Sequence, residues 1–389
     1  MSSIKEYELL SRKINEEVEN ELIKGYISCL DVQLGGGCNA RCIYCDTPLY
    51  RETCQVNLRK VEAMLKTGKI KYIFVCGLGE PTAPSNIGYF KDILRMANSY
   101  GAKVSAFSNC IYMDNELFDL VNKGVYNVIF KLDSFDSAYR QKTYRISNAL
   151  DAQMQANIKT LASIAKNNNS SFTQVAASIV ASKDNFDYMC NIVEFCIKNN
   201  IFPKIGLLEN AGNSTETFDS KSLSQKQVQE IQMFLKTNYG IDDLQALKMC
   251  PAVLGSIFIS NKDRVSLVSG LATSCKWFGL EDNNKEKQHF ITEYDASEIS
   301  TDLYYKVVDA ILKYRLLQLP FVEEVLVQTN KSIIGGCGGD PRQILANMIR
   351  ISRSQVQKSK IFRSSIDNHI LQMDEIANIE SVNDIHIER

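Results

Sequence analysis

The feature that most constrains the fold is a regular alternation of short apolar runs with longer amphipathic segments between about residues 27 and 210. Six runs of strand length are separated by segments with helical periodicity, and each strand–helix unit takes roughly 25–35 residues. This repetition predicts βαβ units with a parallel sheet, here an open, partial (β/α)6 barrel, whose functional residues lie at the carboxyl ends of the strands. The expected strands are YISCLDVQL, KYIFVCGL, KVSAFS, NVIFKLD, QVAASIV and PKIGLLE.

The pattern changes after about residue 215. The segment SLSQKQVQEIQMFLKTNYG predicts a helix that ends at Gly240, IFISNKDRVSLV predicts a β-hairpin, and DLYYKVVDAILKYRLLQ predicts another helix. The expected fold class is therefore α/β, with a partial barrel followed by a C-terminal α+β extension. We divide the chain into an N-terminal helix (1–24), the barrel (25–215), the extension (216–345) and a helical tail (346–389).

Composition excludes several classes of protein. Of the 389 residues, 45% are hydrophobic and 23% are charged, which is ordinary for a chain with a sizeable core. The 44 basic and 45 acidic residues give a net charge of −1, so no overall field favours nucleic acid or an anionic membrane. No run approaches the roughly 18 apolar residues of a membrane-spanning helix, and the charged N-terminus is unlike a signal peptide. We therefore expect a cytoplasmic protein.

Cysteine is the unusual residue, with twelve in the chain against three histidines. Without a secretory signal, this number favours thiols or metal ligands over disulfides. Cys38, Cys42 and Cys45 lie in GGGCNARCIYCDTP, after the first predicted strand. Three such thiolates suit an iron–sulfur cluster or zinc, and a [4Fe–4S] cluster would keep one iron free to bind a small molecule. The alternatives are a zinc site completed by Cys54 and three unrelated core thiols.

The Cys-x3-Cys-x2-Cys spacing, with Tyr44 before the last cysteine, resembles the signature of the radical S-adenosylmethionine (radical SAM) enzymes. The resemblance implies that the open iron binds the amino and carboxylate groups of the SAM methionine. Reductive cleavage then gives a 5′-deoxyadenosyl radical that abstracts a substrate hydrogen, while the protein positions the cofactor. It also implies an electron donor of the flavodoxin or ferredoxin type.

Further motifs extend the resemblance over roughly residues 25–280. The segment GLGEP, with Gly77, Gly79 and Glu80, is similar to the family's Gly-Gly-Glu-Pro, which receives the methionine amino group. Phe107-Ser108-Asn109 resembles the family's Thr-Asn-Gly at the ribose, with Cys110 in place of the glycine.

The fourth strand ends in KLDSFD, where Lys131 stands at a position that is often serine, and Arg145 matches an arginine that frequently follows. Each residue also has an ordinary structural explanation. The glycines would form a tight turn, Asp133 and Asp136 would be helix N-caps, and Arg145 would lie on the surface. The cofactor-binding residues that the resemblance implies are Tyr44, Gly77, Gly79, Glu80, Ser108, Asn109, Lys131 and Arg145.

Three later cysteines, Cys250, Cys275 and Cys337, lie in the extension. Two of them flank the predicted hairpin, and the third lies in the later segment GGCGGD. This arrangement resembles the twitch and SPASM extensions, which bind auxiliary [4Fe–4S] clusters. Asp340 occupies the position of a possible fourth ligand; an open iron or another ligand is the alternative. The ordinary explanation is that these are buried structural thiols.

The sequence thus predicts a radical SAM oxidoreductase that oxidises or rearranges a small molecule of the natural-product, sugar or amino-acid type. About 25 residues precede the first strand, which disfavours leader-guided maturation of a ribosomal peptide, kept as an alternative. The other alternative is a non-catalytic iron–sulfur electron carrier or zinc-binding module. A pI near 6.4 argues against nucleic-acid binding.

Overall fold

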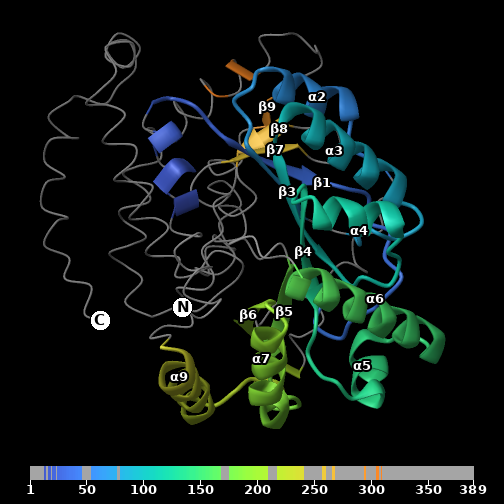
Figure 1. Cartoon of the computed structure of the whole chain (residues 1–389), viewed down its shortest axis with the longest axis vertical. Coiled ribbons are helices and arrows are strands. Elements are labelled where there is room, and N and C mark those ends of the chain that lie inside the picture. Colours follow the sequence, from blue (N-terminus) through green and yellow to red (C-terminus); the bar gives the residue numbers. More distant parts are fainter. Residues whose placement is uncertain are drawn as a thin grey trace, which may run out of the picture.

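One open sheet organises the part of the chain that the computed structural model describes (Figure 1). The strand order is β6-β5-β4-β3-β2-β1-β7-β8-β9; the seven strands from β6 to β7 are parallel, and β8 and β9 are antiparallel. The edge strands β6 and β9 do not pair, so the sheet is not closed. The described residues are 13–14, 16–18, 20–22, 24–45, 54–76, 79–167, 175–208, 217–240, 256–259, 265–267, 293–294, 304–305 and 308. The predicted α/β partial barrel is confirmed.

The six predicted barrel strands are all present, within a few residues of their expected limits. The strands are β1 (Cys29–Gln33), β2 (Tyr72–Cys76), β3 (Lys103–Ser108), β4 (Tyr126–Lys131), β5 (Val175–Ala181), β6 (Phe202–Leu207), β7 (Ser256–Ile259), β8 (Val265–Leu267) and β9 (Glu293–Tyr294). In β4, alternate residues are fully buried, as a pleated strand with one core face requires. At the centre of the sheet, Leu30 lies between Ile73 and Ile257, and all three are fully buried.

Helices connect the parallel strands and cover the sheet (Figure 1). They are α2 (Leu58–Lys66), α3 (Ile87–Tyr100), α4 (Asn115–Asn122), α5 (Ser137–Tyr144), α6 (Asn148–Asn167), α7 (Met189–Lys198), α8 (Phe218–Lys221) and α9 (Gln225–Tyr239), with a 3-10 turn, η2 (Phe186–Tyr188). The predicted stop at Gly240 is confirmed, since this residue closes α9 with a left-handed φ of 68°. Among the described residues, no helix has the length and apolar character needed to cross a membrane.

The predicted hairpin is confirmed in β7 and β8, which pair antiparallel. Its first strand also pairs parallel with β1, so the hairpin extends the barrel sheet. The Ser256 hydroxyl donates to the buried Asp31 carboxylate at 3.0 Å, which fixes β7 against β1. The domain limits proposed from the sequence remain a prediction.

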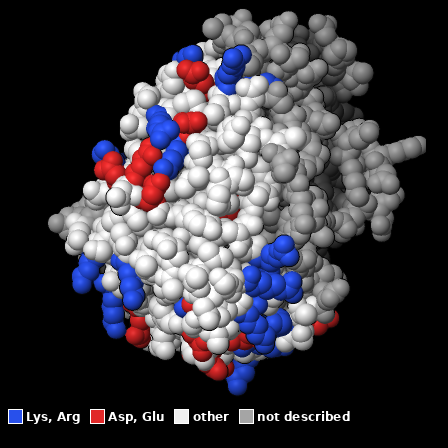
Figure 2. Space-filling model, turned by 90° about the vertical axis from the view of Figure 1, so that its right-hand side faces the viewer, with Lys and Arg blue, Asp and Glu red and all other residues white. Residues whose placement is uncertain are grey.

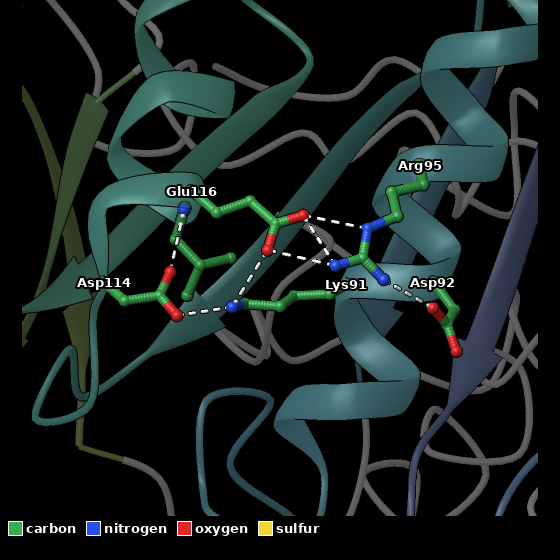
Figure 3. A network of polar contacts seen from close by, with 6 residues as sticks. Lys91, Asp92, Arg95, Asp114 and Glu116 are labelled. Atoms are coloured by element: carbon green, nitrogen blue, oxygen red, sulfur yellow. Dashed lines mark hydrogen bonds and ion pairs between the residues drawn. The ribbon is translucent and has the colours of Figure 1, made fainter.

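Charges are distributed in small groups on the surface. On the face shown in Figure 2, basic and acidic side chains gather around a broad uncharged area. The outer contact between α3 and α4 carries a group of both signs, shown in Figure 3. This distribution agrees with the near-zero net charge of the sequence.

Candidate active site

The three cysteines of the first cluster follow β1 on a loop that crosses to the end of α5. Two backbone hydrogen bonds dock this loop, from Arg41 N–H to the Tyr144 carbonyl and from Ile43 N–H to the Thr143 carbonyl, both at 2.9 Å. Cys38 is exposed, and the other two thiols of the loop are partly buried. The loop is therefore anchored by its backbone, which leaves the sulfur atoms available as ligands.

The electrostatics of the loop favour a bound cation. Burial, together with the charges of Glu80 and Cys45, raises the pKa of the Cys38 thiol to about 11, although a hydrogen bond from Ala40 N–H opposes the rise. Burial also raises the pKa of Cys42 well above its ordinary value, while Lys131 opposes the shift. Thiols in this state become thiolates when a metal supplies positive charge.

Within the described ranges, no three His, Cys, Asp or Glu side chains meet closely enough to hold one metal ion. In a [4Fe–4S] cluster each thiolate binds a different iron, so its ligands are spaced more widely than those of a single zinc ion.

Glu80 lies beside this loop, at the turn that follows β2. Glu80 is 6% exposed, and one carboxylate oxygen, Oε1, accepts from Thr82 N–H (3.1 Å), Thr82 Oγ1 (2.7 Å) and Ser108 Oγ (2.6 Å). The other oxygen, Oε2, accepts from Asn109 N–H at 2.7 Å. Burial raises the pKa of Glu80, and these donors oppose the rise. A carboxylate oxygen can accept more than one bond, so Oε2 keeps room for a further donor.

The turn after β3 joins the cysteine loop and Glu80. The Asn109 side chain donates to Asn39 Oδ1 at 3.0 Å, next to the first cysteine. Cys110, which replaces the family's glycine, has a left-handed φ of 55°, and its N–H donates to Ser108 Oγ. The turn therefore keeps the backbone conformation that glycine adopts most easily, at some cost in strain.

Asp133 follows β4 and is fully buried. It does not cap α5, whose N-cap is Asp136. One carboxylate oxygen accepts from Tyr44 Oη at 2.6 Å and the other from Val180 N–H at 2.7 Å. Lys131 Nζ lies 3.7 Å from Asp133 Oδ2 and 4.6 Å from the centre of the Tyr44 ring. The cysteine loop and the ends of β4 and β5 are thus joined through one carboxylate. Asp136, by contrast, is the N-cap of α5, as the ordinary explanation expected.

The remaining predicted residues have three different outcomes. Arg145 closes α5 with a left-handed φ of 51°, and its side chain is exposed. Gly79 is in the site, beside the cysteine loop. Five predicted residues lie outside the described part of the chain: Gly77, Cys250, Cys275, Cys337 and Asp340.

Three buried asparagines were missed from the sequence. The Asn157 amide on α6 donates to the carbonyls of Cys110 and Ile111, and the Asn185 amide donates to those of Asp133 and Val180. Asn86 acts similarly on the turns after β1 and β2. An asparagine just before a helix, as at positions 86 and 185, is the available signal, but it ordinarily indicates a cap.

A recess opens beside the cysteine loop. It is lined by Tyr44 and by Tyr139, Thr143 and Ser182, with Asp184 and Lys221 also in its wall. The last two form an ion pair at 2.5 Å. The lining is therefore rich in hydroxyls and carries one charge of each sign.

Comparison with known proteins addresses the identity of this site. The sequence model of the Radical SAM superfamily matches residues 32–173, which include the cysteine loop, the Glu80 turn and strands β2 to β4. Residues 32–173 are a radical SAM domain. The family implies an enzyme that uses SAM and a [4Fe–4S] cluster. No curated protein sequence matches the chain.

Several solved structures resemble part of the chain at low identity. SuiB of Streptococcus suis, bound to the precursor peptide SuiA, is 13% identical over 76% of this chain and 68% of its own, with a TM-score of 0.49. Hexahistidine-tagged anSMEcpe with bound AdoMet is 11% identical over 85% of this chain and 98% of its own, also with a TM-score of 0.49. TYW1 with a lysine–pyruvate adduct is 15% identical over 54% of this chain and 74% of its own, with a TM-score of 0.35.

Proposed function

We propose that the protein is a radical SAM oxidoreductase, which cleaves SAM reductively and uses the resulting radical to abstract a substrate hydrogen. One observation carries the proposal: three turns that follow different strands are hydrogen-bonded to one another. Glu80 N–H donates to the Gly37 carbonyl at 2.9 Å, and Asn109 N–H donates to the Glu80 carboxylate. A cofactor that must touch both a cluster and the protein needs such a meeting point.

Cys38, Cys42 and Cys45 would hold the [4Fe–4S] cluster. Their loop is docked on α5 through its backbone, and three thiols within eight residues are ligands that suit an iron–sulfur cluster, so the donor set fits the group. When bound, the cluster supplies the electron that cleaves SAM to the 5′-deoxyadenosyl radical. A flavodoxin- or ferredoxin-type protein would supply that electron to the cluster.

Glu80 and Lys131 are the charged candidates for the two ends of the SAM methionine. The free acceptor capacity of Glu80 Oε2 supports binding of the amino group. The Lys131 ammonium, which faces Tyr44 and Asp133, supports binding of the carboxylate. The other proposed cofactor contacts are Tyr44, Gly77, Gly79, Ser108, Asn109 and Arg145.

A second cluster is proposed on Cys250, Cys275 and Cys337, with Asp340 as a possible fourth ligand. It would accept an electron from the substrate radical or anchor the substrate, and the oxidoreductase assignment depends on it. Iron and labile sulfide after anaerobic reconstitution test the proposal. A Cys38/Cys42/Cys45→Ala triple variant should keep about four irons where the wild type holds about eight. A triple variant that binds no iron would contradict the proposal of a second cluster. An Asp340→Ala variant with the wild-type cluster spectrum would show that Asp340 is not a ligand.

The proposed substrate is a small molecule of the natural-product, sugar or amino-acid type, and a ribosomal peptide is the alternative. Hydroxyls and the Asp184–Lys221 ion pair line the small recess beside Tyr44, where they would offer hydrogen-bond partners to polar groups of such a substrate. Cell extract can be divided by size and added to the reconstituted enzyme with SAM. Stimulation of 5′-deoxyadenosine formation by the small-molecule fraction is expected, and stimulation by the peptide fraction alone would favour the alternative.

The proposed activity is tested by reconstituting the protein anaerobically, adding SAM and a strong reductant, and measuring 5′-deoxyadenosine. The wild type should form it, and Cys38→Ala and Cys42→Ala should form none. Wild-type rates in either variant, or no product from the loaded wild type, would contradict the proposal; the second result would favour a non-catalytic iron–sulfur carrier.

A further inference from the structure

The side chain of Asn86 joins two turns of the candidate site. It is fully buried and stands at the N-cap position of α3, yet it makes no capping hydrogen bond to its own helix. Its amide nitrogen instead contacts the carbonyl oxygens of Gly35 (2.9 Å), Gly37 (3.1 Å) and Glu80 (3.0 Å). One side chain therefore links the segment that leads into Cys38 with the turn that presents Glu80.

Gln55 extends this contact to the far end of the cysteine loop. Its carbonyl accepts from Gly35 N–H at 3.1 Å, and its amide nitrogen donates to Asn86 Oδ1 at 2.7 Å and to the Ser85 carbonyl at 3.2 Å. Gly35 and Gln55 bracket the part of the chain that carries all three cysteines. The side-chain amides of Gln55 and Asn86 therefore connect the two chain segments on either side of the cysteines.

The packing around these amides leaves little room for adjustment. A Cβ atom at Gly37 would lie 2.0 Å from Ser85 Oγ, and one at Gly79 would lie 2.1 Å from the Gly35 carbonyl and 2.9 Å from Asn86 Nδ2. The backbones of the loop and of the Glu80 turn approach each other as closely as glycine permits. A shift of either amide would move both turns.

We propose that Asn86 and Gln55 are positioning residues, which hold the cysteine loop in register with the Glu80 turn so that one SAM molecule reaches both. The inference rests on the proposed function, since it concerns binding at that same site. Neither residue needs to contact the cofactor. Their effect is preorganisation: without them, SAM binding itself would have to order the two turns.

The experiment measures SAM affinity in the full-length, anaerobically loaded protein, from the change that SAM causes in the electron paramagnetic resonance (EPR) spectrum of the reduced cluster. Asn86→Ala should weaken SAM binding about tenfold or more, and Gln55→Ala by a smaller factor. The KM for SAM should rise in both, and by more than kcat falls. Iron content should remain at the wild-type value, because all three cysteine ligands are intact.

Tyr304→Phe is the matched control. The fully buried Tyr304 hydroxyl makes two hydrogen bonds with the backbone of Ile27, at the opposite end of β1. Its loss removes buried hydrogen bonds from the segment that leads into β1 without touching the site, so SAM affinity should stay within about twofold of the wild type.

Unchanged SAM affinity and spectra in both amide variants would overturn the inference, and so would an equal loss in Tyr304→Phe. If Asn86→Ala does not fold, the SAM affinity of Gln55→Ala tests the inference instead. Gln55 is half-buried, and its truncation leaves the contacts of Asn86 with the three carbonyls in place. Loaded wild type that does not bind SAM would refute the proposed function itself. Wild-type binding with unaffected variants would refute the positioning role alone.

Discussion

Two arginine–carboxylate pairs in this protein have nearly the same geometry and very different surroundings. Arg140 binds the Asp151 carboxylate through Nε at 2.6 Å and Nη2 at 2.9 Å. Arg95 binds Glu116 through Nε at 2.8 Å and Nη2 at 3.0 Å, in the network of Figure 3. The first two side chains are 3% and 5% exposed, and the second two are 55% and 37% exposed.

The difference shows where buried polar groups are concentrated in this fold. Arg140 lies on α5 and also donates to the Ser134 carbonyl, next to Asp133. The same helix ends in the two carbonyls on which the cysteine loop docks. The exposed pair only joins α3 to α4, on the outside of the sheet (Figure 3). Breaking the buried pair should therefore affect the fold and the site together, whereas breaking the exposed pair should affect neither strongly.

The largest effect is expected for Arg140→Met. It leaves the Asp151 carboxylate buried without its partner, which costs about 3–5 kcal/mol of unfolding free energy. Urea unfolding of the cluster-free protein measures the loss. A loss below about 1 kcal/mol would show that the buried pair is no more important than an exposed one.

Glu80→Gln should have the next largest effect. The substitution places an amide nitrogen where a carboxylate oxygen now accepts hydrogen bonds, so at least one donor, such as Asn109 N–H, faces another donor. We expect a loss of about 1–3 kcal/mol of stability and a loss of detectable SAM binding by calorimetry. Glu116→Gln in the exposed network is the control and should change stability by less than about 1 kcal/mol. If Glu80→Gln binds SAM with wild-type affinity, Glu80 is not a SAM-binding residue.

Acidification should narrow the gap between the wild type and Arg140→Met. Burial alone would raise the pKa of Asp151, but hydrogen bonds from Arg140 and Ser137 outweigh it and hold the pKa below its ordinary value of 3.8. The pair's contribution is complete above that value and is lost as pH falls through the lower folded-state pKa. Without Arg140, burial raises the pKa of Asp151, so the variant takes up a proton on folding and recovers stability as pH falls from neutral to about 4. A difference that is constant or grows over this range contradicts this prediction.

The smallest effect is expected for Arg95→Met, at less than about 1 kcal/mol. The exposed pair is screened by salt, so the difference from the wild type should shrink further as ionic strength rises. Thermal unfolding at low and high salt measures both. A larger, salt-independent loss would mean that this surface network is coupled to the core.

Hydrophobic periodicity was sufficient to predict the barrel strands and most of its helices. It did not predict α5, because the segment SAYRQKTY buries only Arg140, Thr143 and Tyr144 and has no apolar stripe. It also did not predict that β7 pairs with β1, since the hydrophobic pattern of one strand does not identify its partner strand. Contacts between strands, such as the hydrogen bond from Ser256 to Asp31, determine the pairing.

The motif residues of the site were predictable because ligand chemistry requires particular residue types at particular spacings. Their supports were not. Asn86, Asn157 and Asn185 act on backbone carbonyls, most of them distant in sequence, and any residue can supply a carbonyl. Asp133 likewise has the sequence context of an ordinary helix cap and becomes a bridge only when β4, β5 and the cysteine loop are assembled.

The central claim is that the cysteine loop and the Glu80 turn form one cofactor site. The most direct test is the EPR spectrum of the reduced, reconstituted protein, recorded with and without SAM. The account predicts that SAM changes the wild-type cluster spectrum and leaves that of Glu80→Gln unchanged. A wild-type spectrum unaffected by saturating SAM would contradict it, because the cofactor would then not bind at the cluster held by Cys38, Cys42 and Cys45.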